Sequence, residues 1–244
     1  MQIKENKFIP SIFNYCDRWC EHCAFADRCR LYSMEEKRKE ETGGKEFSFV
    51  EELQETFAET KKLIEEYSEK FDTVLPNFEE IEKKELPETQ LSFLSTKYFE
   101  DAAVYLKNLM NEIKENSAVS VIIPQNPGIV PLHQIVGCYE VLQWYHTIIP
   151  VKVTRAISSA AQYDPGDEEF EYSMEDANGS AFVAFKSVLK SLVALGVILG
   201  WTESLKNETL NLIIDAGRIK SLIEKDFPGA SMFVWPPVVK KEVK

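Results

Sequence analysis

The sequence predicts an all-α protein, a bundle of four to five long helices with a small cysteine-rich module near its start. Three observations lead to this fold class. Apolar residues recur every three or four positions in five separate segments, which is the spacing of a helix with one buried face. Only residues 119–123, Val-Ser-Val-Ile-Ile, resemble a strand, and a single short strand has no partner in this sequence. Four of the five cysteines stand within fourteen residues.

The cysteine-rich module is centred on the segment from Cys16 to Cys29, with the spacing C-x3-C-x2-C-x5-C. On a helix that turns about 100° per residue, Cys16, Cys20 and Cys23 share one face, whereas Cys29 points away from it. All four thiols can therefore converge only if the chain turns between Cys23 and Cys29. We expect that turn at residues 24–26.

Thiols at this density in a chain without a secretory signal usually hold a metal. Four thiolates suit Zn2+ and also suit a 4Fe-4S cluster, so both metals stay open. The spacing from Cys20 to Cys29 resembles the pattern of auxiliary iron–sulfur domains. The spacing from Cys16 to Cys23 resembles the radical S-adenosylmethionine signature, although His22 stands where that signature usually has an aromatic residue. The sequence also lacks the alternating strands and helices of those enzymes.

Two other interpretations of the cysteines remain open. His22 could replace one thiolate as a metal ligand, and the thiols could instead be buried or paired in disulfides. Arg18, Arg28 and Arg30 are close in sequence. We expect their charge to offset metal-bound thiolates and to lower the pKa values of the thiols.

Composition divides the chain into three parts. Residues 1–33 form the metal-binding module, in which a helix is expected from residue 10 or 11. Residues 34–46 form a linker whose first half could be helical, because the glycine pair that breaks any helix stands near its end. Residues 47–244 form the helical bundle and an extended C-terminal tail.

The first three helices of the bundle are expected at about residues 49–71, 96–115 and 131–161. An acidic, proline-containing loop separates the first two. The third contains Pro150, which cannot donate a hydrogen bond to the carbonyl of His146. A kink is therefore predicted at this point of the helix.

The fourth helix is expected to begin near Ser173 and Asp176, which are spaced loosely as in a capping box, and to end near residue 201. Small residues form a second edge beside its apolar stripe, so a neighbouring helix can pack closely. The fifth helix is expected at about residues 203–226, and the sequence Phe-Pro-Gly at 227–229 ends it.

The composition restricts the partners and the compartment. The 244 residues suit one domain with an appendage, and 44% of them are hydrophobic. The net charge of −12 argues against general nucleic-acid binding and against anionic membranes. The first residues lack the apolar core of a signal peptide, so a cytoplasmic protein is expected. Residues 181–201 are nearly long enough to cross a membrane, but Lys186 and Lys190 within them make that costly.

Three stretches of the C-terminal half resemble a group of uncharacterised bacterial helical proteins. They are EVLQWYHTIIPVKVTRA at residues 140–156, DANGSA at 176–181 and FPGASMF at 227–233. The resemblance implies a helical bundle and no particular chemistry.

The sequence reveals no reaction. It has neither the Glu-x-x-His motifs of di-metal bundles nor a G-x-S-x-G nucleophile elbow. Glu140 and His146 are the only catalytic candidates that we name, and Cys138 is most simply a core thiol.

Three functions remain open. The first is a redox or regulatory metal-binding protein whose bundle could receive a protein partner. The second is a metal-dependent enzyme with a substrate cleft in the bundle, and the third is an adaptor with purely structural zinc. The oligomeric state is left open.

Overall fold

The computed structural model describes residues 8–41, 57–58, 61–62, 64, 86–120 and 130–235. These residues belong to two compact units. One consists of Ile9–Cys23 and the chain from Leu86 onward, and the other consists of Phe8 and Ala24–Glu85 as far as they are described.

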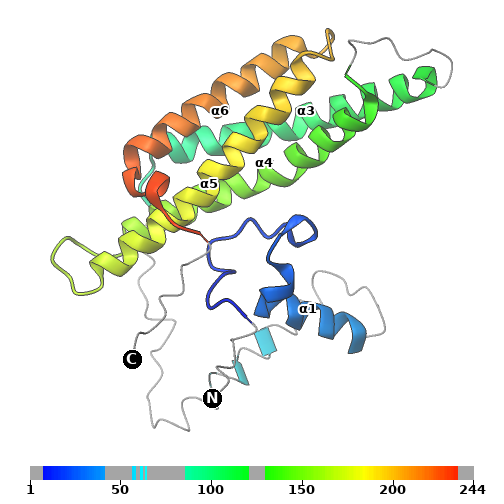
Figure 1. Cartoon of the computed structure of the whole chain (residues 1–244). Helices are drawn as coiled ribbons and strands as arrows, with labels where there is room; N and C mark the ends of the chain where they lie inside the picture. The colour runs from blue at the N-terminus through cyan, green and yellow to red at the C-terminus, as the bar shows by residue number, and fades with distance from the viewer. Residues whose placement is uncertain are drawn as a thin grey trace. The chain divides into compact units, whose positions relative to one another are not determined.

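The larger unit is a bundle of four long helices, which confirms the predicted all-α class (Figure 1). Each helix packs against two neighbours, in the cyclic order α3, α4, α5, α6, and the most extensive interface joins α4 and α5. Successive helices run in opposite directions (Figure 1). The described part of the chain contains no strand, only an isolated bridge between Pro165 and Asp167. The helices are α3 (Gln90–Ser120), α4 (Leu132–Ala160), α5 (Phe170–Leu199) and α6 (Lys206–Asp226).

The apolar stripes read from the sequence form the core of this bundle. Large side chains from all four helices are completely excluded from solvent, among them Tyr98, Tyr145, Leu195 and Ile219. The small residues of α5 are buried as well, which lets α4 approach closely, as the sequence predicts. They include Ala177, Ser180, Ala181, Ala184, Ser187, Ser191 and Ala194.

Two helix starts differ from the sequence prediction. The helix expected from residue 96 begins at Gln90, because Thr89 and Ser92 cap each other there. The Thr89 hydroxyl accepts the Ser92 N–H, and the Ser92 hydroxyl accepts the Thr89 N–H, each at 3.0 Å.

The capping box expected at Ser173 and Asp176 is wrong. Helix α5 begins at Phe170, and both residues lie inside it. Their side chains bond to α4 instead, because Ser173 donates to the carbonyl of Ser159 and Asp176 pairs with Arg155.

Helix α4 continues through Pro150, so the helix does not end there. The helix expected at residues 49–71 lies largely outside the described residues, although residues 57, 58, 61, 62 and 64 are helical. Residues 121–123 of the expected extended connection are also outside, and α3 includes residues 119 and 120. A short 3-10 helix, η3 (Pro228–Met232), follows α6.

The smaller unit contains a helix near the start of the chain. A 3-10 turn, η2 (Ala26–Arg28), leads through Cys29 into α1 (Arg30–Glu41). Part of the expected linker, residues 34–41, is therefore helical.

Candidate functional site

The cysteine segment does not form the helix that the sequence analysis places from residue 10 or 11. Residues 10–15 form turns, and Ser11 and Arg18 have φ angles of 55° and 60°. These left-handed values are incompatible with a continuous right-handed helix. The argument that three cysteines share one helical face therefore does not apply.

Two short 3-10 turns each end at a cysteine. The turn η1 (Cys20–His22) ends at Cys23, whose N–H donates to the Cys20 carbonyl at 3.1 Å. The turn η2 ends at Cys29, whose N–H donates to the Ala26 carbonyl at 3.0 Å. Between them the chain turns at residues 24 and 25, which is within the range predicted for a turn.

The segment Ile9–Cys23, which we call the anchor segment, lies against α4 and α5 of its own unit. Its central contact is Asp17. The Tyr145 hydroxyl donates to Asp17 Oδ2 at 2.6 Å, and Lys190 Nζ donates to the same oxygen at 3.0 Å. The Trp144 indole N–H donates to the Asp17 backbone carbonyl at 2.9 Å. Three side chains of α4 and α5 thus donate hydrogen bonds to one residue that lies between Cys16 and Cys20.

Aromatic side chains extend this contact. The ring of Trp19 stacks on Trp144, with centroids 5.4 Å apart and planes inclined by 20°. The same ring meets Tyr145 edge-on at 5.7 Å and His22 edge-on at 4.4 Å. Trp19 therefore connects η1 to α4 directly.

A second contact lies at the other side of Cys16. The Tyr15 hydroxyl donates to Asp176 Oδ1 at 3.2 Å. Asp176 also accepts hydrogen bonds from Arg155 Nη2 and Ser159 Oγ, both at 2.6 Å. Burial disfavours the charged form of Asp176, but these three donors outweigh it and lower its pKa.

The thiol of Cys16 lies between these two contacts and is half-buried. Its sulfur donates to the carbonyl of Phe13 at 3.4 Å. Burial raises the pKa of the thiol, although the Arg18 N–H and the charges of Arg18 and Lys152 act in the opposite direction. Arg18 thus acts on the Cys16 thiol in the expected direction, but desolvation is the larger effect and leaves the pKa raised.

All five cysteines are free, so the described thiols form no disulfide. Among the described residues, no group of three or more histidine, cysteine, aspartate or glutamate side chains is arranged to hold a metal ion. Convergence of the thiols of Cys16, Cys20, Cys23 and Cys29 remains a prediction. Cys138 is half-buried at the margin of the bundle core, as a core thiol would be.

The two catalytic candidates on α4 do not come together. Glu140 is exposed. The His146 ring stacks on Phe99 with centroids 5.4 Å apart, and its Nδ1 lies 2.8 Å from the Gln143 carbonyl of the same helix. Neither residue lines the hollow at the start of α5 or the one between α3 and α6.

Sequence reasoning missed the residues that hold the anchor segment. Asp17, Tyr145 and Asp176 carry no local signal, because their partners lie far away along the chain. Lys190 does carry one, since a lysine inside a long apolar helix indicates a polar partner nearby. Of the described helices, only α5 is apolar and long enough to cross a membrane by length and composition. Its position between α4 and α6 and its pairing with Asp17 are those of a helix in a packed bundle.

Comparison with known proteins gives no match: no family model fits the chain, and neither curated proteins nor solved structures include a significant relative.

Proposed function

We propose that this chain is a metal-binding protein whose Cys16, Cys20, Cys23 and Cys29 hold an iron–sulfur cluster or Zn2+. The observation that carries the proposal is the density of free thiols, four within fourteen residues. In the cytoplasm, where we place the protein, thiols stay reduced and available as ligands.

The anchor segment supports this proposal because it holds the backbone at Cys16, Cys20 and Cys23 in place. Asp17 and Trp19 fasten the backbone between Cys16 and Cys23 to α4 and α5. A backbone held in this way limits the positions that the thiols must search before they bind. The charges of Arg18 and Lys152 near Cys16 would offset a thiolate there.

The donor chemistry suits both metals, but the described side chains do not form a ready set of three or more ligands. The proposal therefore includes a rearrangement of thiols on binding. When bound, an iron–sulfur cluster would supply one-electron transfer, whereas zinc would supply stability. The bundle then acts as the support that fixes the segment.

The test is to purify the chain without oxygen and to measure iron, sulfide and zinc together with the visible spectrum. We expect a stoichiometric metal. A brown protein with absorption near about 400 nm identifies iron–sulfur, and a colourless protein that contains zinc identifies the structural alternative.

Single cysteine-to-serine variants show which residues are ligands. Each change at positions 16, 20, 23 and 29 should lower the metal content by half or more, as ligand loss does. Cys138→Ser is the matched control and should keep the metal content of the unaltered chain. The proposal is overturned if the four variants retain as much metal as this control, or if the unaltered chain contains none after anaerobic purification with both metals supplied.

A further inference from the structure

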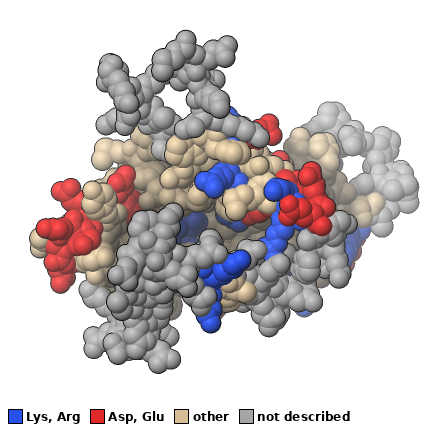
Figure 2. Space-filling model, turned by 90° about the horizontal axis from the view of Figure 1, so that it is seen from below, with Lys and Arg blue, Asp and Glu red and all other residues tan. Residues whose placement is uncertain are grey.

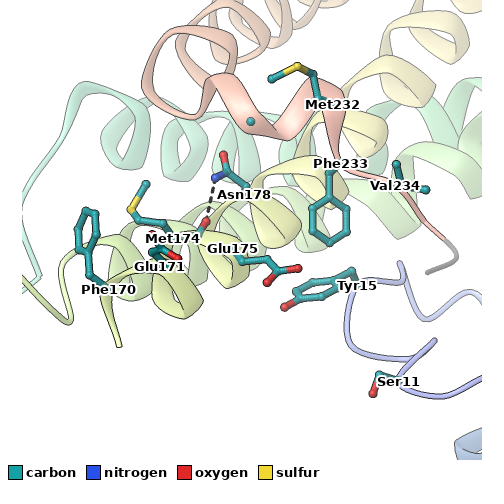
Figure 3. Close-up of a pocket in the computed structure, with 11 residues that line it drawn as sticks. Ser11, Tyr15, Phe170, Glu171, Met174, Glu175, Asn178, Met232, Phe233 and Val234 are labelled. Atoms are coloured by element: carbon teal, nitrogen blue, oxygen red, sulfur yellow. Dashed lines mark hydrogen bonds between the residues drawn. The ribbon is translucent and has the colours of Figure 1, made fainter. Parts of the chain in front are cut away.

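A hollow between described residues of the bundle unit lies where α5 begins. It has a volume of about 760 Å3 and is open to solvent (Figure 3). Three stretches distant in sequence surround it: the anchor segment, the first turns of α5, and the chain through η3 to Val234.

The walls of this hollow are held in place by close contacts. The rings of Tyr15 and Phe233 meet edge-on with centroids 4.8 Å apart. Both rings rest on Gly179, since a Cβ at that position would lie 2.5 Å from Tyr15 and 2.9 Å from Phe233. The Asn178 amide lies against Gly229 in the same way, at 2.7 Å from a Cβ placed there. The glycines thus allow side chains to approach the backbone and form a preformed concave surface.

The lining combines apolar side chains with acidic ones. The apolar part of the wall is formed by Phe170, Met174 and Phe233. Two further apolar residues of the lining are largely exposed, Met232 at 76% and Val234 at 62%. Methionine side chains adapt to varied apolar surfaces, which makes them frequent in peptide-binding sites.

Glu171 and Glu175, one helical turn apart on α5, line the same hollow, and no lysine or arginine does. Neither glutamate forms an ion pair with a described lysine or arginine. The turn from α4 to α5 adds three exposed acids at residues 167–169. Figure 2 shows acidic side chains gathered at the end of the molecule where this turn lies in Figure 1.

We propose that this hollow is a docking site for a basic, apolar peptide segment of a partner protein. Apolar side chains of the segment would enter between Met174, Phe233 and Met232, and its lysines or arginines would lie beside Glu171 and Glu175. Charge complementarity identifies this occupant, because a lining that combines glutamates with apolar side chains favours a cation-bearing apolar ligand and repels an acidic one. The net charge of −12 acts in the same direction at longer range. This function is separate from the metal proposed above.

The experiment uses the full chain and three fluorescein-labelled twelve-residue peptides, measured by fluorescence anisotropy at low salt. The probe contains leucine and lysine in a pattern with one apolar face. One control replaces each leucine by serine, and the other replaces each lysine by glutamate. We expect only the leucine–lysine peptide to bind, and to bind more weakly as salt is added. Equal binding of the serine–lysine peptide overturns the proposal, since charge alone would then explain it.

Variants of the chain locate the binding site. Replacing both Glu171 and Glu175 by glutamine should weaken binding about fivefold, as expected for the loss of two exposed charge pairs. The matched control removes two exposed acids elsewhere, with Glu115→Gln and Glu208→Gln, and should change the affinity less than twofold. Equal effects of the two pairs contradict a local site.

The apolar contact is tested in the same way. Met174→Ser with Met232→Ser should weaken binding about tenfold, whereas Val193→Ser, at a residue 70% exposed elsewhere on α5, should leave the affinity unchanged. Helicity by circular dichroism shows that each variant folds. An unchanged affinity in the methionine variant overturns the proposal.

The chain itself contains a competing segment, because residues 236–244 include Lys240, Lys241 and Lys244 among valines. Replacing these three lysines by serine in the full chain separates the two occupants. An affinity for the probe peptide within twofold of the unaltered chain supports an external partner. A tenfold gain shows that this tail occupies the hollow, which overturns the partner proposal.

Discussion

Two carboxylates hold the anchor segment against the bundle, and they do so from opposite sides. Asp17 lies on the segment, and its carboxylate accepts hydrogen bonds from Tyr145 on α4 and Lys190 on α5. Asp176 lies on α5 and accepts one hydrogen bond from the segment, that of Tyr15. Its other two partners, Arg155 and Ser159, both belong to α4.

This difference separates attachment of the segment from packing of the helices. Without the segment, Asp176 keeps its two bonds to α4, so it joins the helices in any case. Tyr145 and Lys190 would instead lose the carboxylate that accepts hydrogen bonds from both. The hydroxyl of the buried Tyr145 would then keep only its hydrogen bond from Lys190. Asp17 is therefore the residue on which attachment depends most.

The largest effect is expected for Asp17→Ala. The substitution removes the charged acceptor of Asp17 and leaves the Tyr145 hydroxyl without the group to which it donates. The free energy of unfolding should therefore fall by about 2–3 kcal/mol. Urea unfolding followed by tryptophan fluorescence measures this change. Hydrogen exchange should show faster exchange in residues 9–23 than in the core of α4.

The control is Asp164→Ala, at an exposed position in the turn between α4 and α5. It should change the free energy of unfolding by less than about 0.5 kcal/mol. A similar loss in both variants would show that Asp17 does not hold the segment.

The second largest effect is expected for Gly179→Ala, which tests the rings on the Asp176 side. The new methyl group would lie 2.5 Å from Tyr15, so ring and backbone must move apart. Overpacking costs about 1–3 kcal/mol, and the better helix propensity of alanine returns about 1 kcal/mol. A net loss of up to about 2 kcal/mol is expected in thermal or urea unfolding.

Gly196→Ala is a matched control on the same helix, because no atom lies within 4 Å of a Cβ at that position. It should stabilise the protein by about 0.5–1 kcal/mol, since only the helix propensity changes. If both substitutions stabilise, the close contact at Gly179 is not real.

The sequence was sufficient for the fold of the bundle because its helices are defined by local periodicity. Within each helix, apolar residues recur every three or four positions. Members of these stripes on three different helices, such as Tyr98, Leu142 and Ile219, are all buried. Helix starts were less predictable. Phe170 opens α5 without a side-chain cap, and the residues expected to cap it bond to α4 instead.

The cysteine segment shows why the site could not be predicted in the same way. Its cysteines stand at helix-compatible spacing, yet Arg18 adopts a left-handed conformation with φ of 60°. Asp17 is fixed there by residues 128 and 173 positions away. No local pattern contains contacts of that length, so tertiary structure overrides the local spacing.

A smaller change in the free energy of unfolding is expected at acid pH, where the Asp176 carboxylate becomes protonated. Hydrogen bonds lower the pKa of Asp176 in the folded protein below the value of about 3.9 in an unfolded chain. Between those two values the unfolded chain binds more protons, so the free energy of unfolding rises with pH. The contribution of Asp176 is therefore complete above pH of about 4 and is lost as the pH falls through the folded pKa.

Asp176→Asn removes this titration. The difference in free energy of unfolding between the unaltered chain and this variant should be constant from pH 5 to 7 and should shrink below pH of about 4. Urea unfolding at each pH measures it. A difference that does not change with pH would mean that the charge of Asp176 makes no contribution.

The smallest effect is expected for Tyr15→Phe, which removes one half-buried hydrogen bond of 3.2 Å and keeps the ring against Phe233. The free energy of unfolding should fall by about 0.5–1.5 kcal/mol at pH 7.

Burial first, and then the charge of Asp176, raise the pKa of Tyr15 to about 12. The folded protein therefore keeps the phenol proton where an unfolded chain, with a pKa of about 10, begins to lose it. The contribution of the hydroxyl is complete below pH of about 10 and falls as the pH rises toward 12. The contributions of other buried tyrosines to the free energy of unfolding also fall in that pH range. The diagnostic quantity is therefore the difference in free energy of unfolding between the unaltered chain and Tyr15→Phe. That difference should narrow above pH of about 10 while Arg155 and Asp176 stay paired, and a constant difference would place the Tyr15 hydroxyl in water rather than on Asp176.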